Sequence, residues 1–377
     1  MTPAGAGLRV AIVHDWLTGM RGGERVLEAL CRIYPDATVF TLVHTPGSVS
    51  PAIERHLRRV SFVGRLPGAR RSWRHFLPLF PAAVEQFDLD GFDLVLSSSH
   101  CAAKAIVRPG KTRHLCYCHS PMRYAWDQFE AYFGPERVGP LVSGLLRARL
   151  AALARWDAAT AARVDRFLAN SQHVAGRIRR YYNREAVVVY PPVDTDFYTP
   201  EAGPRGVFFL AVSALVPYKR LDVAIRACQA LSAPLTIVGD GPERDRLSRI
   251  AGAEATFLGR VDDRMLRGLY RQAIALVMPG EEDFGMAPVE AQACGRPVVA
   301  LARGGALESV DDGVSGVLVA NDGVEAFAQG LERARRMHVD PEAVRARALR
   351  FSRARFDAGV RGAVEALMAE PVRVEVA

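Results

Sequence analysis

The sequence predicts an α/β protein with two domains, each a parallel sheet covered by helices. Short, nearly all-apolar runs alternate with helical patterns, which is typical of parallel strands buried on both faces. A proline-containing break at 190–194 separates two such series. The chain has 377 residues, which is long for one core and sufficient for two.

The first series opens with a strand at 8–14, followed by Gly22, Gly23 and a helix at 24–33. A glycine pair between a strand and a helix lets a phosphate approach the backbone amides closely. The further strands expected in this half are 93–97, 114–118, 166–170 and 186–190, with a long helix at 141–162.

The second series supplies strands at 207–212, 235–239, 255–259, 274–279, 297–301 and 316–319, followed by helical stretches at 344–356 and 357–369. We therefore expect an N-terminal domain over 1–193 and a C-terminal domain over 194–356, with 357–377 returning to pack on the first. Ligands bind at the carboxyl ends of parallel strands, so the expected site is a cleft that both domains face.

Composition narrows the functional classes. Apolar residues make up 49% and charged residues 24%, and no run approaches the roughly 20 apolar residues that span a bilayer. Residues 1–7 lack the pattern of a signal peptide, which predicts a cytoplasmic enzyme. The six scattered cysteines are expected to be buried and reduced, without disulfide or metal roles.

The chain carries a net charge of +8, which suggests an acidic partner such as a phosphate, an anionic membrane or a nucleic acid. Nucleic acid is the disfavoured alternative, because the arginines are dispersed and no recognisable nucleic-acid module accompanies them.

The most informative segment is 281–290, EEDFGMAPVE. Pro288 suits the first turn of a helix whose amides attract phosphate. Glu282 precedes that helix and Glu290 lies on it, and carboxylates accept strong hydrogen bonds from sugar hydroxyls. The segment is suited to hold both parts of a nucleotide-sugar. The alternative is a solvated acidic turn beside a surface helix.

Two further motifs, 117–127 (YCHSPMRYAWD) and 215–222 (LVPYKRLD), occur in order with this segment. Together they resemble glycosyltransferase family 4, a group of retaining, metal-independent enzymes with the GT-B fold. Within that family they are similar to bacterial mannosyltransferases of cell-surface polysaccharide assembly. The resemblance covers nearly the whole chain.

The resemblance implies catalytic roles for three residues. Glu282 would contact the transferred sugar, Lys219 would neutralise the departing diphosphate, and His119 would touch the sugar without acting as a general base. Lys219 could instead be a solvated residue at a helix start, and His119 a structural histidine.

The remaining implied contacts are to the donor. Glu290 would bind the ribose hydroxyls, and the family often has an arginine where this chain has Ala214. Either Lys219 and helix amides suffice, or Arg220 or Arg260 supplies the second charge. The full set of implied donor-binding residues is Gly22, Gly23, Arg220, Gly239, Arg260, Phe284, Gly285, Met286 and Glu290.

No metal site or cofactor is expected, because no Asp-x-Asp element lies at a strand end to hold a divalent ion against the diphosphate.

The region that would bind the acceptor is less well defined by the sequence. A stretch at 55–75 holds many arginines and runs into the apolar 76–81. It suits an anionic membrane surface, or equally a solvated loop followed by a core segment.

The favoured function is a retaining transfer of a hexose, mannose from GDP-mannose, onto a lipid-linked glycan, with the enzyme peripheral on the inner leaflet. The alternatives are a UDP-hexose donor, a nonhydrolysing sugar epimerase on the same fold, and a non-catalytic nucleotide-sugar sensor. Ala214 is the best support for the sensor.

Overall fold

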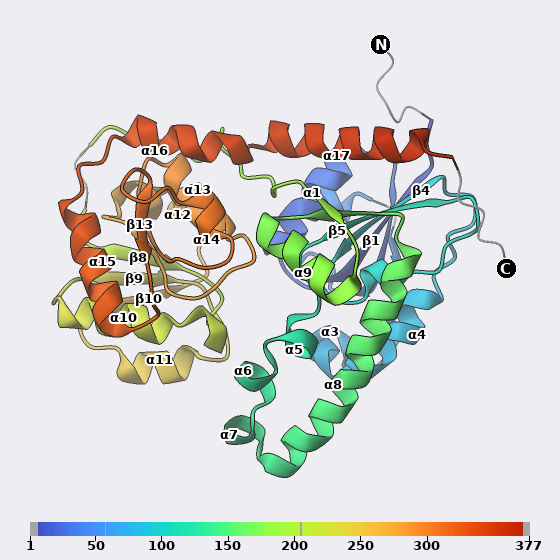
Figure 1. Cartoon of the computed structure of the whole chain (residues 1–377), viewed down its shortest axis with the longest axis horizontal. Coiled ribbons are helices and arrows are strands. Elements are labelled where there is room, and N and C mark those ends of the chain that lie inside the picture. Colours follow the sequence, from blue (N-terminus) through green and yellow to red (C-terminus); the bar gives the residue numbers. More distant parts are fainter. Residues whose placement is uncertain (1–6, 57, 204–205, 372–377) are drawn as a thin grey trace. The chain divides into compact units, whose positions relative to one another are not determined.

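The computed structural model describes residues 7–56, 58–203 and 206–371. The expectation for the first residues of the chain therefore lies almost wholly outside the described part, as does the end of the predicted 357–377 segment. The chain divides into two compact units, Met1–Pro192 with Ala354–Ala377 (unit 1) and Val193–Arg353 (unit 2). Each unit is an α/β domain around its own parallel sheet (Figure 1).

The sheet of unit 1 has seven strands in the order β3-β2-β1-β4-β5-β6-β7, and all neighbours are parallel. The strands are β1 Val10–Leu17, β2 Thr38–His44, β3 Arg58–Val60, β4 Leu94–Ser99, β5 Arg113–Cys118, β6 Arg166–Ala169 and β7 Ala186–Val188. The helices are α1 Gly22–Ile33, α2 Pro51–Glu54, α3 Ala69–Ser72, α4 Phe80–Glu85, α5 Arg123–Trp126, α6 Phe129–Phe133, α7 Pro135–Val138, α8 Pro140–Thr160, α9 Gln172–Tyr182 and α17 Arg353–Ala369. Short 3₁₀ helices lie at Val63–Arg65, Trp73–Leu79, Ala103–Ala105 and Ala161–Arg163.

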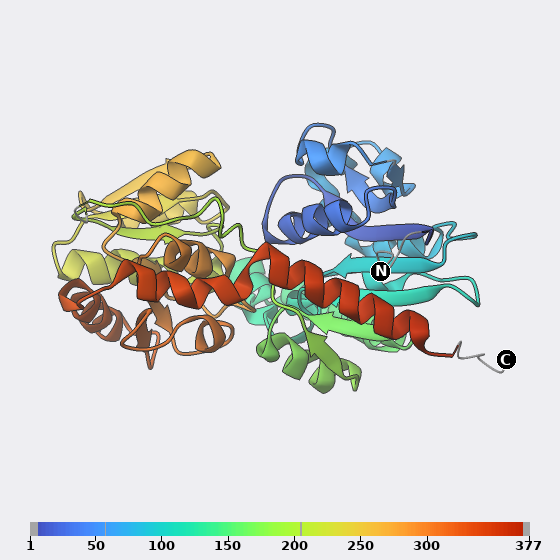
Figure 2. The same ribbon diagram turned by 90° about the horizontal axis from the view of Figure 1, so that it is seen from above.

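Helix α17 comes last in the chain and packs on unit 1 (Figure 2). Its buried face, which includes Phe356, Val360 and Leu367, belongs to the same core as apolar side chains of α1 and β1. The apolar spacing of this helix therefore encodes a partner that lies far away in the sequence.

The sheet of unit 2 has six parallel strands in the order β10-β9-β8-β11-β12-β13. The strands are β8 Phe209–Val212, β9 Leu235–Val238, β10 Ala255–Gly259, β11 Leu276–Met278, β12 Val298–Leu301 and β13 Gly316–Val319. The helices are α10 Leu221–Ala230, α11 Arg244–Ile250, α12 Asp263–Gln272, α13 Met286–Ala293, α14 Ala306–Ser309, α15 Val324–Arg336 and α16 Pro341–Ala348, with 3₁₀ helices at Pro217–Lys219 and Leu349–Phe351.

The predicted fold class is confirmed, since both units are parallel α/β sheets in a Rossmann-like arrangement. The predictions omit β2 and β3. Strand β3 has only three residues, two of them arginine, and so lacks an apolar run. Strand β2 has an apolar run and is recognisable in hindsight.

The first strand was predicted to end at His14, but β1 continues to Leu17 and buries Asp15 within it. The six cysteines are all free and buried, as expected. Within the described residues, no helix is long and apolar enough to cross a bilayer.

Candidate active site

The loop after β4 is organised by the buried carboxylate of Asp15. Its Oδ2 accepts hydrogen bonds from the backbone N–H groups of His100 and Cys101 at 2.8 and 3.0 Å, and its Oδ1 accepts those of Ala102 and Ala103 at 2.7 and 2.8 Å. Such charge-assisted bonds replace the hydration that a buried carboxylate loses. Asp15 thereby fixes the loop that carries His100.

Three histidines gather at this end of the unit 1 sheet. The Ser98 hydroxyl bridges two of them, at 3.0 Å from His14 Nδ1 and 2.8 Å from His119 Nε2. The ring of His100 lies 6.0 Å from that of His119 and 6.1 Å from that of His14. His119 follows β5 directly, so the cluster lies at the carboxyl ends of β1, β4 and β5.

Burial keeps the His119 imidazole neutral. Burial, followed by the charges of His100 and His14, lowers the pKa of His119 well below its usual value. Burial also lowers the pKa of His100, although the Asp15 charge opposes it. A neutral His119 suits hydrogen bonding to a polar ligand better than it suits charge stabilisation.

Helix α1 begins beside this cluster. A Cβ placed on Gly23 would lie 3.6 Å from His14 Cε1 and 3.8 Å from His119 Nε2. Glu24, in the first turn, lies 3.8 Å from His14 Nε2. Burial raises the pKa of Glu24, but His14, together with the His100 charge and a backbone hydrogen bond, lowers it, and the net pKa is lowered. The structure thus brings Gly22, Gly23 and His119 together.

In unit 2 the central feature is an ion pair between Lys219 Nζ and Glu282 Oε1. Both side chains are 14% exposed. Lys219 ends the 3₁₀ helix after β8, and Glu282 lies in the loop between β11 and α13. The pair therefore joins two loops at the carboxyl ends of neighbouring strands.

Three glycines let the backbone around this ion pair pack tightly. A Cβ on Gly280 would lie 2.5 Å from the carbonyl oxygen of Tyr218, and one on Gly304 would lie 2.3 Å from that of Glu282. The N–H of Gly305 donates to the same Glu282 carbonyl at 2.9 Å. The position of Glu282 thus depends on neighbours that have no side chain.

Glu290 lies on α13, the helix that begins shortly after the acidic residues 281–283. Its Oε2 accepts a hydrogen bond of 2.8 Å from the buried hydroxyl of Tyr270. Burial, followed by the Glu290 charge, raises the pKa of Tyr270 well above its usual value, so the hydroxyl remains a donor. Tyr270 orients this carboxylate and leaves it half-buried.

Four other predicted donor-binding residues lie in the loops and helix start of unit 2. Gly285, with φ +83°, turns the chain into α13, which Met286 opens. Phe284 is 2% exposed and its ring packs on Phe351, so only its backbone is available to a ligand. Gly239 is required locally, because φ is +134° and a Cβ would lie 1.8 Å from the Ser213 carbonyl oxygen.

The two candidate replacements for the family arginine differ. Arg220 adopts φ +50° and its guanidinium pairs with Asp322 and, at 3.5 Å, with Asp222. Arg260 is exposed after β10, and Ala214 is exposed after β8. Arg220 is therefore already engaged by two carboxylates.

Sequence reasoning missed Asp15, Ser98 and Tyr270. The available signal for the first two was a polar residue inside an apolar strand and the run of small residues SSSHCAA at 97–103. Tyr270 gave no signal, because its partner lies on another helix.

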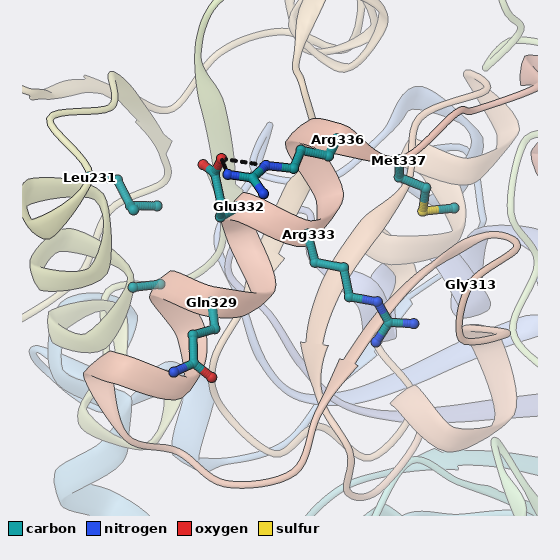
Figure 3. A pocket seen from close by; sticks show the side chains of 8 residues that line it. Leu231, Gly313, Gln329, Glu332, Arg333, Arg336 and Met337 are labelled. Carbon is teal, nitrogen blue, oxygen red and sulfur yellow. Dashed lines mark hydrogen bonds and ion pairs between the residues drawn. The ribbon is translucent and has the colours of Figure 1, made fainter.

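A surface pocket elsewhere on unit 2 is unrelated to these residues. It lies along α15, where Glu332 accepts a hydrogen bond from Arg336 at 2.9 Å (Figure 3). None of the predicted site residues lines it. In the described part of the chain, no group of three or more His, Cys, Asp or Glu side chains is arranged to hold a metal ion.

Comparison with known families assigns a class to each part of the chain. Residues 20–197 match the model of Glycosyltransferase Family 4, and residues 206–336 match that of Glycosyl transferases group 1. The chain is 33% identical to the D-inositol 3-phosphate glycosyltransferase of Mycolicibacterium smegmatis over 198 aligned positions, which cover 45% of this chain and 46% of the relative. The corresponding protein of Mycobacterium bovis is 32% identical over 47% of this chain and 42% of its own length.

Solved structures share the fold over nearly the whole chain. HepE from Anabaena in complex with UDP-glucose superposes with a TM-score of 0.70 at 18% identity, covering 95% of this chain and 99% of HepE. Sucrose-phosphate synthase from Thermosynechococcus elongatus gives 0.72 at 18% identity, covering 96% and 99%.

The fold and both family matches define the class as glycosyltransferases with the GT-B fold. Within that class the chain is of the family 4 type. The matched part spans less than half the length of the curated relatives.

Proposed function

We propose that this chain is a retaining hexosyltransferase that takes its sugar from a nucleotide-sugar. The observation that carries the proposal is the Lys219–Glu282 ion pair beside the start of α13, with Glu290 oriented on the same helix. A cation for the diphosphate and two carboxylates for hydroxyl groups are the chemistry that such a donor needs.

In the proposed reaction, the bond between the sugar C1 and the diphosphate oxygen breaks, and a new bond forms from C1 to an acceptor oxygen on the same face. The acceptor proton passes to the departing phosphate oxygen. Lys219 offsets the charge that develops on the diphosphate, and Glu282 holds the sugar hydroxyls. The proposal assigns a sugar contact to His119, and diphosphate contacts to the amides of Gly22 and Gly23.

The expected donor is GDP-mannose, on the strength of the motifs at 117–127 and 215–222. A UDP-hexose is the second candidate, and it is favoured by the fold neighbour in complex with UDP-glucose. Thermal stabilisation and hydrolysis across GDP-mannose, UDP-glucose, UDP-galactose and UDP-N-acetylglucosamine discriminate between them. Selective stabilisation by one donor, lost in Glu282→Ala but kept in Glu201→Ala, supports the proposal. No response to any of the four contradicts it.

A fixed lysine and helix amides perform the task that a divalent ion performs in other transferases. We therefore propose metal-independent turnover. Exhaustive treatment with EDTA leaves the rate unchanged if this is right, and abolishes it reversibly if a metal is needed.

The proposed acceptor is a lipid-linked glycan at the inner leaflet. Its support is the basic segment 55–75, in which Arg65, Arg70, Arg71 and Arg74 are exposed. In the apolar continuation, Phe80 is 1% exposed and Phe76 packs partly buried against the same cluster, whereas Leu79 is 39% exposed. Attraction of the arginines to anionic lipid, at about 1 kcal/mol per arginine, then contributes more to membrane binding than insertion of apolar side chains does.

Replacing Arg70, Arg71 and Arg74 together by Glu abolishes retention on anionic vesicles if the segment binds a membrane. Unchanged retention excludes the segment. The curated relatives are named for D-inositol 3-phosphate, and a phosphorylated polyol is therefore the alternative acceptor class.

A further inference from the structure

A line of four polar side chains crosses the carboxyl end of the unit 1 sheet. Glu24 of α1 faces His14 of β1, and its Oε1 lies 3.8 Å from His14 Nε2. His14 Nδ1 lies 3.0 Å from the Ser98 hydroxyl of β4. The same hydroxyl lies 2.8 Å from Nε2 of His119, which follows β5. The four groups therefore form a chain that runs from a carboxylate to the histidine of the proposed sugar contact.

Three members of this chain are withdrawn from solvent. His14 and Ser98 are 0% exposed and Glu24 is 2% exposed. Within the described residues, Nε2 of His14 is a buried nitrogen without a hydrogen-bond partner. A buried polar group costs free energy unless a group of the right polarity faces it. The positions of the protons in this chain are therefore constrained by its own members.

The Ser98 hydroxyl transmits polarity because it has a single proton. It can donate to only one of the two histidines, and its oxygen then accepts from the other. A neutral imidazole has one N–H and one acceptor nitrogen, so the choice at His14 determines the choice at His119. Burial lowers the pKa of His119 well below its usual value, which keeps that ring neutral. With both rings neutral, the chain has two possible arrangements of protons.

The charge of Glu24 selects between the two arrangements. Its net pKa is lowered despite burial, so the carboxylate is ionised at neutral pH. A carboxylate attracts an N–H at Nε2 of His14, whereas it would repel a lone pair there. His14 Nδ1 then accepts from the Ser98 hydroxyl, and Ser98 Oγ accepts from the Nε2–H of His119.

In this arrangement His119 retains one acceptor nitrogen for a ligand. Its Nε2–H is donated to Ser98, so the lone pair lies on Nδ1. No hydrogen bond within the described residues involves that Nδ1, and His119 is only partly buried. His100 lies outside the chain, because its own Nδ1 is 3.2 Å from Asp15 Oδ2.

We propose that Glu24 is a positioning residue that fixes the tautomer of His119. Acting through His14 and Ser98, it leaves Nδ1 of His119 as the acceptor for a hydroxyl group of the transferred sugar. The inference rests on the proposed transferase function and deepens it, because it states which atom acts and which ligand group that atom takes. A sugar hydroxyl can donate to Nδ1, whereas an ionised phosphate oxygen only accepts.

The first test reads the proton positions directly and needs no ligand. The histidines of the full chain are labelled with nitrogen-15, and a two-bond proton–nitrogen correlation spectrum is recorded about 1.5 pH units above the ordinary histidine pKa of about 6.5. His14→Gln and His119→Gln assign the signals. We expect a single proton on Nε2 of both rings. A proton on Nδ1 of His119, or two protons on His14, overturns the proposal.

Three folded variants, verified by thermal melting, test the cause. Glu24→Gln removes the charge at nearly constant size, so the tautomer ratio of His119 should fall about tenfold or more. Ser98→Ala removes the link, so His14 keeps its proton on Nε2 while His119 shows both tautomers. Glu28→Gln, which alters a buried carboxylate of α1 whose ion pair is with a residue of the same helix, should match the wild type. An unchanged His119 tautomer in Glu24→Gln would exclude Glu24 as the positioning residue. If that variant does not fold, the wild-type spectrum and Ser98→Ala decide.

A second readout connects the tautomer to the ligand. Calorimetry measures the affinity of the best-binding sugar-nucleotide and of its nucleoside diphosphate for wild type, Glu24→Gln and Glu28→Gln. We expect Glu24→Gln to weaken the sugar-nucleotide about tenfold relative to the nucleoside diphosphate, because only the former carries the sugar hydroxyls. Equal weakening of both, or of neither, overturns the sugar contact. If no nucleotide binds the wild type, the proposed function fails and the sugar contact with it, while the spectra still decide the tautomer.

Discussion

At the scale of single residues, Asp15 organises the loop that follows β4, because one carboxylate accepts four backbone amides. Asp15→Asn keeps the size of the side chain but removes its charge. It also turns an NH2 group, itself a donor, towards backbone N–H groups that need an acceptor. We expect it to lower the free energy of unfolding by roughly 2–4 kcal/mol, as measured by urea denaturation. The exposed Asp88→Asn, whose side-chain oxygen can still accept the single bond from the Asp90 amide, serves as the control and changes stability by about 0.5 kcal/mol or less. Equal effects of the two variants would show that the four bonds contribute nothing.

His114 gives a pH-dependent prediction. It is buried against Ser97 and the carbonyl of Arg163, and burial lowers its pKa to about 3. Below the ordinary histidine pKa, near 6.5, the unfolded chain binds a proton that the folded chain does not, so stability falls as the pH drops towards 3. The slope of unfolding free energy against pH between these values should be smaller in His114→Gln by about 1.4 kcal/mol per pH unit. The exposed His75→Gln should keep the wild-type slope, and identical slopes in all three proteins would refute the linkage.

At the scale of elements, the loop after β9 depends on one backbone conformation. Gly239 has φ +134° and no room for a Cβ beside Ser213. Gly239→Ala is expected to destabilise unit 2 by roughly 3 kcal/mol or more, in thermal or urea unfolding. In contrast, Gly268 lies within α12 with open space around it. Gly268→Ala should therefore stabilise unit 2 by about 0.5–1 kcal/mol. If Gly268→Ala instead destabilised it as much as Gly239→Ala, the backbone conformation and close packing at Gly239 would not be the cause.

At the scale of the whole molecule, the end of the chain supports the domain with which the chain begins. Leu367 of α17 is fully buried in the core of unit 1. Leu367→Ala should cost roughly 2–5 kcal/mol and speed amide exchange in β1 and β4, while β8, β9 and β11 exchange as before. Leu331→Ala, a matched buried leucine of α15 in unit 2, should show the reverse pattern. Equal acceleration in both sheets would mean that the two units unfold together.

The sequence was sufficient for elements whose signal is local. Long apolar runs and the loop 281–290 are recognisable because strand burial and helix starts depend on neighbouring residues. The sequence was insufficient for residues whose role depends on a partner far away along the chain. Asp15 is tolerable inside β1 only because the amides at 100–103 meet it, and the Tyr270 hydroxyl is useful only because Glu290 lies beside it. The pairing of Lys219 with Glu282 likewise follows from the strand order and from no local pattern.

The central claim is that Lys219 offsets the charge of a departing diphosphate. The direct measurement is the rate at which wild type, Lys219→Met and Lys111→Met release nucleoside diphosphate from the donor that binds best. Lys111 is an exposed lysine in a turn of unit 1 and serves as the matched control. The account predicts that Lys219→Met lowers kcat by about 100-fold or more with a folded protein, because a fixed charge at the leaving group is lost, while Lys111→Met is unaffected. Equal kcat in Lys219→Met and wild type would contradict it.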